Sequence, residues 1–267
     1  MIKTAMVLAA CHGTRMRPLT NDRAKAMVEV GGKPLIDHML DRLEAAGVER
    51  AVVNVHAHAD HLEAHLKARK TGPEIIISDE REALLETGGG MVKALPLLGD
   101  EPVLACNIDA IWRDADAQAM AALLSRVDTW ATYDEHTAYK THDYSAIGEL
   151  IGKWDPAIME DLLLLAPIER TLGYHGKGDF LFAHDGRLER RGERESAPYV
   201  YAGVQITKLD RLAKEPIERF SRNRIWNQTL EVGTIFGHLM DGFWMHVGDP
   251  AARDEAEAIL QEKQASA

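Results

Sequence analysis

The chain has 267 residues, of which 46% are hydrophobic and 27% are charged, a composition ordinary for a globular protein with a substantial core. Its formal net charge of −11 argues against a general nucleic-acid-binding protein, because such proteins neutralise phosphates with an excess of basic residues. The N-terminal apolar run is too short for a signal peptide or a membrane span, and two cysteines make no disulfide framework. We therefore expect a cytoplasmic protein with no nucleic-acid or membrane partner.

The first 106 residues alternate predicted strands with predicted helices. Residues 5–10 form an apolar run typical of a buried strand, and a helix follows at 34–46 with Pro34 in its first turn and Gly47 beyond its end. Further strands are expected at 51–55, 74–78 and 102–106, and further helices at 58–70 and 92–98. This alternation predicts a Rossmann-like α/β fold whose parallel strands are covered by helices on both faces.

The second half of the chain changes character. Residues 162–166 are entirely apolar, as in a central strand, and Asp185-Gly186 is a hairpin signal between 180–183 and 187–190. The remaining expected elements are a strand at 199–206 and helices at 222–232 and 250–264. Because no Pro/Gly/Ser-rich linker divides the chain, we expect one α/β domain over residues 1–267 with a mixed, mainly parallel sheet.

The most informative stretch follows the first predicted strand. It contains, in chain order, Ala9, Ala10, Gly13, Thr14, Arg15 and Lys25. Ligands of open α/β sheets bind at the carboxyl ends of the strands, where this loop lies. Backbone N–H groups and guanidinium groups together make a cradle for anions. The stretch therefore predicts a phosphate-binding site, which locally concentrated basic residues permit despite the acidic net charge.

Residues 8–20, LAACHGTRMRPLT, resemble the signature of the sugar-1-phosphate nucleotidyltransferases, which reads LAAGxGTRMRPLT before a PKP-like segment around the lysine. The resemblance continues in LETGGG at 85–90, NID at 107–109, HGKGDF at 175–180 and WMHVG at 244–248. These later motifs look most like the uridylyltransferases that act on N-acetylmuramate 1-phosphate. The resemblance implies a glycosyltransferase-A-like fold and Mg²⁺-dependent transfer of UMP from UTP to N-acetylmuramate 1-phosphate, with release of pyrophosphate.

The resemblance also assigns roles around the nucleotide. It implies that Arg15 clamps the triphosphate, that Lys25 places a point charge near the reacting centre, and that Asp109 binds Mg²⁺. These three are the expected catalytic residues, because nucleotidyl transfer needs positioning and charge neutralisation rather than a protein nucleophile. The further expected nucleotide-binding residues are Ala9, Ala10, Gly13, Thr14, Glu86, Gly88 and Gly89.

For the sugar phosphate, the resemblance implies contacts from Asn107, Lys177, Asp179 and Gly203. Lys177 is equally well interpreted as a solvated charge on a hairpin. Asp249 and His246 are weaker candidates for a second metal ligand. Asp249 is better interpreted as the cap of the final helix, and Mg²⁺ prefers oxygen to the nitrogen of His246.

Several positions depart from the family pattern: Cys11, Ala24, Ala26, Ile108 and His246. They support a second hypothesis, in which the chain has reduced or lost catalysis and binds nucleotide or sugar as a sensor or partner. GTP with mannose 1-phosphate is the alternative substrate pair. Residues 113–152 fit the family least well and predict an insertion, either on the surface or serving as a lid or a contact in a homo-oligomer.

Overall fold

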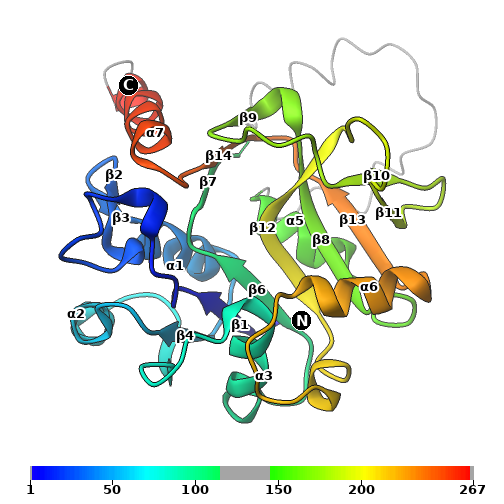
Figure 1. The fold of residues 1–267 in the computed structure, drawn as a ribbon, viewed down its shortest axis with the longest axis horizontal. Coiled ribbons are helices and arrows are strands. Elements are labelled where there is room, and N and C mark those ends of the chain that lie inside the picture. Colours follow the sequence, from blue (N-terminus) through cyan, green and yellow to red (C-terminus); the bar gives the residue numbers. More distant parts are fainter. Residues whose placement is uncertain (1, 115–144, 265–267) are drawn as a thin grey trace, which may run out of the picture.

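The computed structural model describes residues 2–114 and 145–264 (Figure 1). The strands of the main sheet are β1 Thr4–Leu8, β4 Arg50–Val55, β5 Glu74–Asp79, β6 Val103–Asn107, β8 Asp161–Pro167, β10 Phe180–Phe182, β11 Leu188–Arg190, β12 Tyr199–Thr207 and β13 Ile235–Leu239. Within the described residues these nine strands lie in the order β11–β10–β12–β6–β1–β4–β5, and β8 with β13 branches from β12. β1, β4, β5 and β6 are parallel, whereas β12 runs antiparallel to both β6 and β8.

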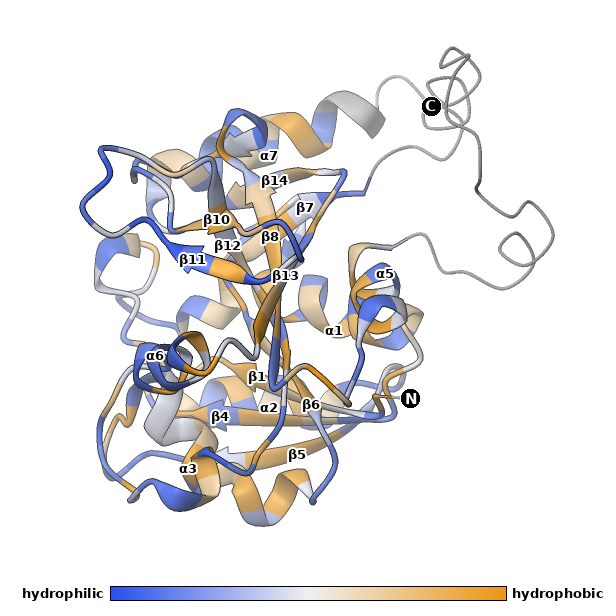
Figure 2. Ribbon diagram, turned by 90° about the vertical axis from the view of Figure 1, so that its right-hand side faces the viewer, coloured by the Kyte–Doolittle hydropathy of each residue, from blue (hydrophilic) through white to orange (hydrophobic). Residues whose placement is uncertain are grey.

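Helices cover both faces of this sheet. Their bounds are α1 Leu35–Ala45, α2 Ala59–Ala68, α3 Glu86–Leu98, α5 Ala146–Lys153, α6 Asn223–Glu231 and α7 Pro250–Gln264. Side chains alternate along β1, so that Ala5 and Val7 join a core with α1, α2 and α5, while Met6 joins a core with α3. Figure 2 shows the strands between the helices mostly in hydrophobic colours. The predicted α/β fold with a mixed sheet is confirmed.

Three sets of strands were not predicted. β2 Glu29–Val30 pairs antiparallel with β3 Lys33–Pro34 in a two-stranded sheet. β13 lies beside β8, and a separate small sheet pairs β7 Ala110–Arg113 with β14 Phe243–His246 and β14 with β9 Thr171–Leu172. The segments of the small sheet are short and carry no clear alternation of apolar and polar residues, so periodicity alone does not reveal them. The small sheet matters for the site because β7 begins directly after Asp109 and β14 ends at His246.

The predicted helix at 92–98 begins too late, since α3 starts at Glu86. Three consecutive glycines lower the intrinsic helix propensity of its first turns. Tertiary packing requires them there: a Cβ on Gly88 would lie 2.3 Å from the Phe220 ring, and one on Gly89 would lie 1.9 Å from the carbonyl oxygen of Glu218. Close approach of the 218–220 segment therefore explains glycines inside a helix.

Most of the predicted insertion at 113–152 lies outside the described residues, which omit 115–144. α5 lies at its carboxyl end and begins after Ser145, whose side chain accepts a hydrogen bond from the backbone N–H of Gly148. Within the described ranges, no helix is long and apolar enough to cross a membrane.

The glycines of α3 and α5 make a matched pair for a stability test. Gly89→Ala should lower the free energy of unfolding by about 1–3 kcal/mol, because its Cβ overlaps backbone. Gly152→Ala should raise it by about 0.5–1 kcal/mol, since a Cβ there meets nothing within 4 Å and alanine favours the helix. Urea unfolding followed by circular dichroism measures both changes. Equal effects at the two positions would contradict this account of the packing.

Candidate active site

The candidate site lies at the carboxyl ends of the neighbouring strands β1 and β6. From β1 the chain builds β4 and β5 on one side and then crosses to β6 on the other, which makes this the switch point where α/β sheets bind ligands. Leu8 pairs with Asn107 at the carboxyl ends of the two strands. The residues that follow them, Ala9 and Ala10 on one side and Asp109 on the other, therefore border the site.

A buried ion pair lies at this point. The ammonium group of Lys25 donates a hydrogen bond to Oδ2 of Asp109 at 2.8 Å. Lys25 is 4% exposed and is flanked by buried Ala24 and Ala26, so the two alanines found in place of the family's prolines do not leave the lysine loose. Burial by itself would raise the pKa of Asp109, but Lys25 and His246 hold that pKa well below its usual range. The carboxylate is therefore ionised at neutral pH.

His246 reaches the same carboxylate from the opposite end of the chain. Its Nε2 lies 3.5 Å from Oδ2 of Asp109, and its Nδ1 lies 3.4 Å from the carbonyl oxygen of Gly173. The ring stacks on Trp244, whose Nε1–H donates to the carbonyl oxygen of Ala202. Pairing of β14 with β7 places His246 opposite Ala110, one residue after Asp109. The structure thus brings His246 to Asp109, while metal binding by His246 stays a prediction.

The loop after β1, which is predicted to bind phosphate, is shaped by Gly13. Its φ of 59° is left-handed, and a Cβ would lie 3.0 Å from side-chain atoms of Lys25 and Thr20. Thr20 fixes the loop by donating its hydroxyl hydrogen to the carbonyl oxygen of Gly13 at 2.8 Å. Thr14 and Arg15 are exposed in the following turn, Thr14–Met16. Among the described residues the Arg15 guanidinium has no hydrogen-bond or ion-pair partner, so it is available to an external anion.

Two residues that sequence reasoning missed hold the start of this loop. Asn54 Oδ1 accepts hydrogen bonds from the backbone N–H groups of Ala9 at 2.7 Å and Ala10 at 3.2 Å. Asn54 Nδ2 donates in turn to the buried carboxylate of Glu80, whose other oxygen accepts from the N–H of Leu85. The N–H groups of Ala9 and Ala10 are therefore already bonded within the protein. The only sequence signal was an asparagine inside the apolar run at 51–55.

The glycines predicted to approach the base lie in α3. Gly88 and Gly89 donate their N–H groups to the carbonyl oxygen of Phe220 at 2.9 and 3.3 Å. Their lack of side chains serves this packing, and nucleotide binding by them stays a prediction. Glu86, at the start of the helix, has a left-handed φ of 61° and pairs with Arg219 at 2.8 Å. Glu86 also lines a pocket of about 280 Å³ beside the loop, together with Leu8, Ala10, Cys11, Asn54, Leu84, Thr87 and Ser221.

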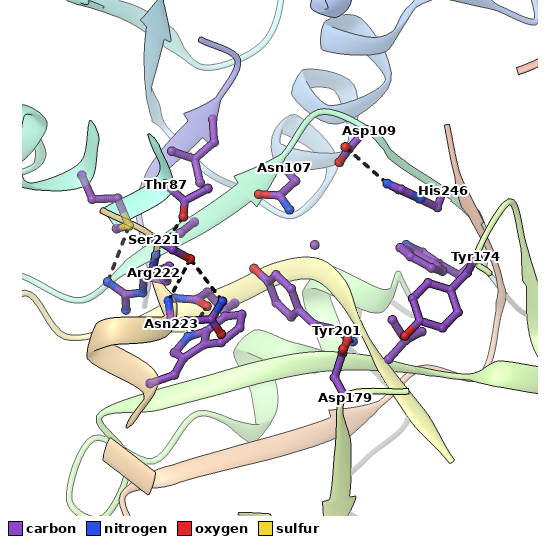
Figure 3. A pocket seen from close by; sticks show the side chains of 18 of the residues that line it. Thr87, Asn107, Asp109, Tyr174, Asp179, Tyr201, Ser221, Arg222, Asn223 and His246 are labelled. Carbon is purple, nitrogen blue, oxygen red and sulfur yellow. Dashed lines mark hydrogen bonds and ion pairs between the residues drawn. The ribbon is translucent and has the colours of Figure 1, made fainter. Parts of the chain in front are cut away.

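A larger cavity, of about 400 Å³, extends from Asp109 and His246 (Figure 3). Three of the four predicted sugar-phosphate residues line it: Asn107, Asp179 and Gly203. The Asp179 carboxylate is oriented by the backbone N–H of Tyr201 at 3.0 Å. The fourth, Lys177, is exposed and does not line the cavity, which fits its interpretation as a solvated hairpin charge.

Asp249 lies at the start of α7. Its Oδ1 accepts the N–H of Ala252 at 2.9 Å, which supports the preferred interpretation of Asp249 as a helix cap, and metal binding by Asp249 stays a prediction. Within the part of the chain that the structure describes, no group of three or more His, Cys, Asp or Glu could enclose a metal ion. Asp109 still fits Mg²⁺, because this ion commonly takes one or two carboxylates and completes its shell with water and substrate phosphates.

Comparison with known proteins agrees with this geometry. The family model for nucleotidyl transferases matches residues 4–140. The N-acetylmuramate alpha-1-phosphate uridylyltransferase of Caulobacter vibrioides is 47% identical over 263 residues, which is 97% of this chain and 98% of that protein. The protein of the same name from Neisseria meningitidis is 44% identical over 256 residues, 96% of this chain and 97% of that protein.

Solved structures show the same fold. A UDP-glucose pyrophosphorylase complexed with UDP-glucose superposes with a TM-score of 0.74 at 14% identity, covering 98% of this chain and 100% of that one. The inositol-1-phosphate CTP transferase from T. maritima superposes with a TM-score of 0.70 at 17% identity, covering 98% and 97%. The family model and the relatives of similar length show that the chain belongs to the nucleotidyl transferase family.

Proposed function

We propose that this chain transfers UMP from UTP to N-acetylmuramate 1-phosphate and releases pyrophosphate. The observation that carries the proposal is the buried Lys25–Asp109 pair, which lies at the switch point of the sheet beside a cavity of about 400 Å³. A cavity of this size suits a small polar ligand. The names of the two relatives from Caulobacter and Neisseria support the choice of nucleotide and sugar.

The reaction needs no covalent protein intermediate. An oxygen of the sugar phosphate forms a bond to the α-phosphorus of UTP, the bond from that phosphorus to the bridging oxygen breaks, and pyrophosphate leaves. In this proposal Lys25 neutralises the charge that builds on the phosphate oxygens, and Arg15 clamps the triphosphate from the loop. Asp109 holds the Lys25 ammonium at 2.8 Å, so the lysine needs little reorganisation during the reaction.

Asp109 is the residue that would hold Mg²⁺ in a cytoplasmic enzyme of this kind. The ion would supply further positive charge at the α-phosphate. His246 contributes through Asp109, because an imidazole nitrogen is a poor ligand for a hard ion. Asn107, Asp179 and Gly203 would contact the sugar phosphate from the walls of the cavity.

The test of this proposal is pyrophosphate release over a panel of nucleoside triphosphates and sugar 1-phosphates in the presence of Mg²⁺. We expect turnover with UTP and N-acetylmuramate 1-phosphate at about one to a thousand per second. A preference for GTP and mannose 1-phosphate would show that the chain acts on the alternative substrate pair instead. Binding of nucleotide without turnover on any pair would favour the sensor hypothesis, which rests on the departures from the family pattern at Cys11, Ala24, Ala26, Ile108 and His246.

Arg15→Ala should weaken UTP binding by about 10- to 100-fold, because the variant loses a charged contact worth about 1.5–3 kcal/mol. Binding of the sugar 1-phosphate alone should change little. Isothermal titration with each ligand separates the two effects. Arg23→Ala is the matched control, since the Arg23 guanidinium is bonded to Asp22 instead. Unchanged UTP affinity in the Arg15 variant would show that the phosphate cradle is misassigned.

Asp109→Asn should reduce Mg²⁺-dependent turnover by on the order of 100-fold or more, because the variant lacks the proposed metal-binding charge. The asparagine oxygen can still accept the hydrogen bond of Lys25, so the fold should stay intact by circular dichroism, while the uncompensated ammonium of Lys25 should lower the melting temperature.

Asp249→Asn is the matched control for Asp109→Asn. It removes a carboxylate but keeps the cap of α7, because asparagine caps helices as well as aspartate does. Turnover should therefore be retained. If Asp249→Asn lost activity and Asp109→Asn kept it, the metal-binding role would belong to the other carboxylate.

A further inference from the structure

The larger cavity has two chemically different ends. Asp109 and His246 lie at one end, where the proposed function places the phosphates. Figure 3 shows Ser221 and Asn223 at the other end, with Asn107 and Tyr201 between. A sugar whose anomeric phosphate is held near Asp109 would direct its ring substituents toward Asn223. The groups at that second end therefore decide which sugars fit.

Arg190, from β11, is one of two arginines at the second end, the other being Arg222. Nη2 of Arg190 donates to Oδ1 of Asn223 at 2.7 Å and of Asn227 at 3.2 Å. Its guanidinium lies over the rings of Phe180 and Trp226, 4.9 and 5.5 Å from their centroids. These four neighbours fix the Arg190 side chain on the cavity wall. The two asparagine amides bond only to Nη2 of Arg190, so they leave its Nε and Nη1 free of amide contacts. Arg190 is therefore held in place as a donor before any ligand arrives.

The charge of Arg190 is not neutralised within the described ranges. No carboxylate there lies within 4 Å of its guanidinium, in contrast to buried Arg222, which pairs with Asp161 at 2.7 Å. Burial lowers the pKa of Arg190, and the more distant Asp179 opposes that change. A partly buried guanidinium that stays protonated without an anion beside it is poised to bind one.

Gln205 adds a second donor on the same wall. It is 1% exposed, and Trp226 donates its indole N–H to Gln205 Oε1 at 2.9 Å. Because an indole nitrogen only donates, this bond fixes which atom of the amide is the oxygen. The remaining atom, Nε2, is buried with no hydrogen-bond partner in the described structure. An unpartnered buried donor is costly unless a ligand satisfies it.

We propose that Arg190, with Gln205, binds a carboxylate carried on the sugar ring and makes the enzyme select acidic sugar 1-phosphates over neutral ones. The inference rests on the proposed function and names the residues that set its substrate class. The guanidinium supplies a planar fork that matches a carboxylate, and the aromatic rings beneath it exclude water from the contact. A neutral sugar leaves both donors without an acceptor, which penalises its binding.

The test compares two substrates that differ by one acidic group. N-acetylmuramate 1-phosphate carries a lactyl carboxylate, and N-acetylglucosamine 1-phosphate is the same sugar without it. The measured quantity is the ratio of kcat/KM for the acidic over the neutral sugar, with UTP and Mg²⁺. Arg190→Met should lower this ratio by about 10- to 100-fold. Arg190→Lys, which keeps the charge but lacks the fork, should lower it less.

Arg194→Met is the matched control, because Arg194 follows β11 and pairs with exposed Glu189 outside the cavity. In the Arg194→Met variant, the ratio of kcat/KM for the acidic over the neutral sugar should equal that of the parent protein. The proposal would be overturned if both Arg190 variants kept the parent protein's ratio of kcat/KM for the acidic over the neutral sugar. It would also be overturned if the variants raised only the KM for UTP. Either result would leave the proposed uridylyl transfer intact. Failure of the parent protein to use either sugar would instead refute the proposed function, and this inference with it.

Discussion

The ion pair between Lys25 and Asp109 is the constraint on which the site depends. It joins a loop that follows β1 to the end of β6, 84 residues later, at a point where both side chains are largely withdrawn from water. Removing one partner would leave an uncompensated charge, which makes such buried pairs sensitive to substitution. His246 extends the link to the C-terminal part of the chain, so three distant segments meet on one carboxylate.

β12 connects this centre to the cavity. It pairs with β6 on one side and β8 on the other, but its register against β8 shifts between Tyr201 and Gln205. Gly203 lies in the irregular segment with a φ of 85°, and a Cβ there would lie 3.0 Å from Ala110. The bulge lets β12 approach β7 closely while it presents Tyr201 and Gln205 to the cavity.

The sequence was most informative where a local motif carries the geometry. The apolar runs predicted the central strands β1, β4, β5, β6, β8 and β12, and the order of strands and helices predicted an α/β sheet, whose carboxyl edge is where ligands of such sheets bind. Gly13 and Lys25 could be identified because they lie in the stretch that resembles the nucleotidyltransferase signature and its PKP-like segment. The contact of Lys25 with Asp109 is consistent with the topology, since β1 and β6 are neighbours and end at the same edge of the sheet.

What the sequence could not reveal depends on long-range packing. Asn54 and Glu80 are polar residues whose partners are defined only by the folded sheet. The glycines of α3 resemble a ligand-binding turn in sequence. In the structure, their lack of side chains lets residues 218–220, about 130 residues further along the chain, pack against the helix. Arg190 lies on a short strand outside every motif, so its position on the cavity wall becomes visible only when α6 packs beside it.

The hydrogen bond from Asn54 to Glu80 makes the loop after β1 sensitive to conversion of Asn54 to aspartate. The carboxamide accepts from the loop after β1 on one side and donates to a carboxylate on the other, 2.7 Å away. Conversion of Asn54 to aspartate, by deamidation or by a single-base mutation, would replace that donor with a second acid facing Glu80. One of the two acids would then have to take up a proton to stay in place. A change of one atom would thus make the shape of the phosphate loop depend on pH.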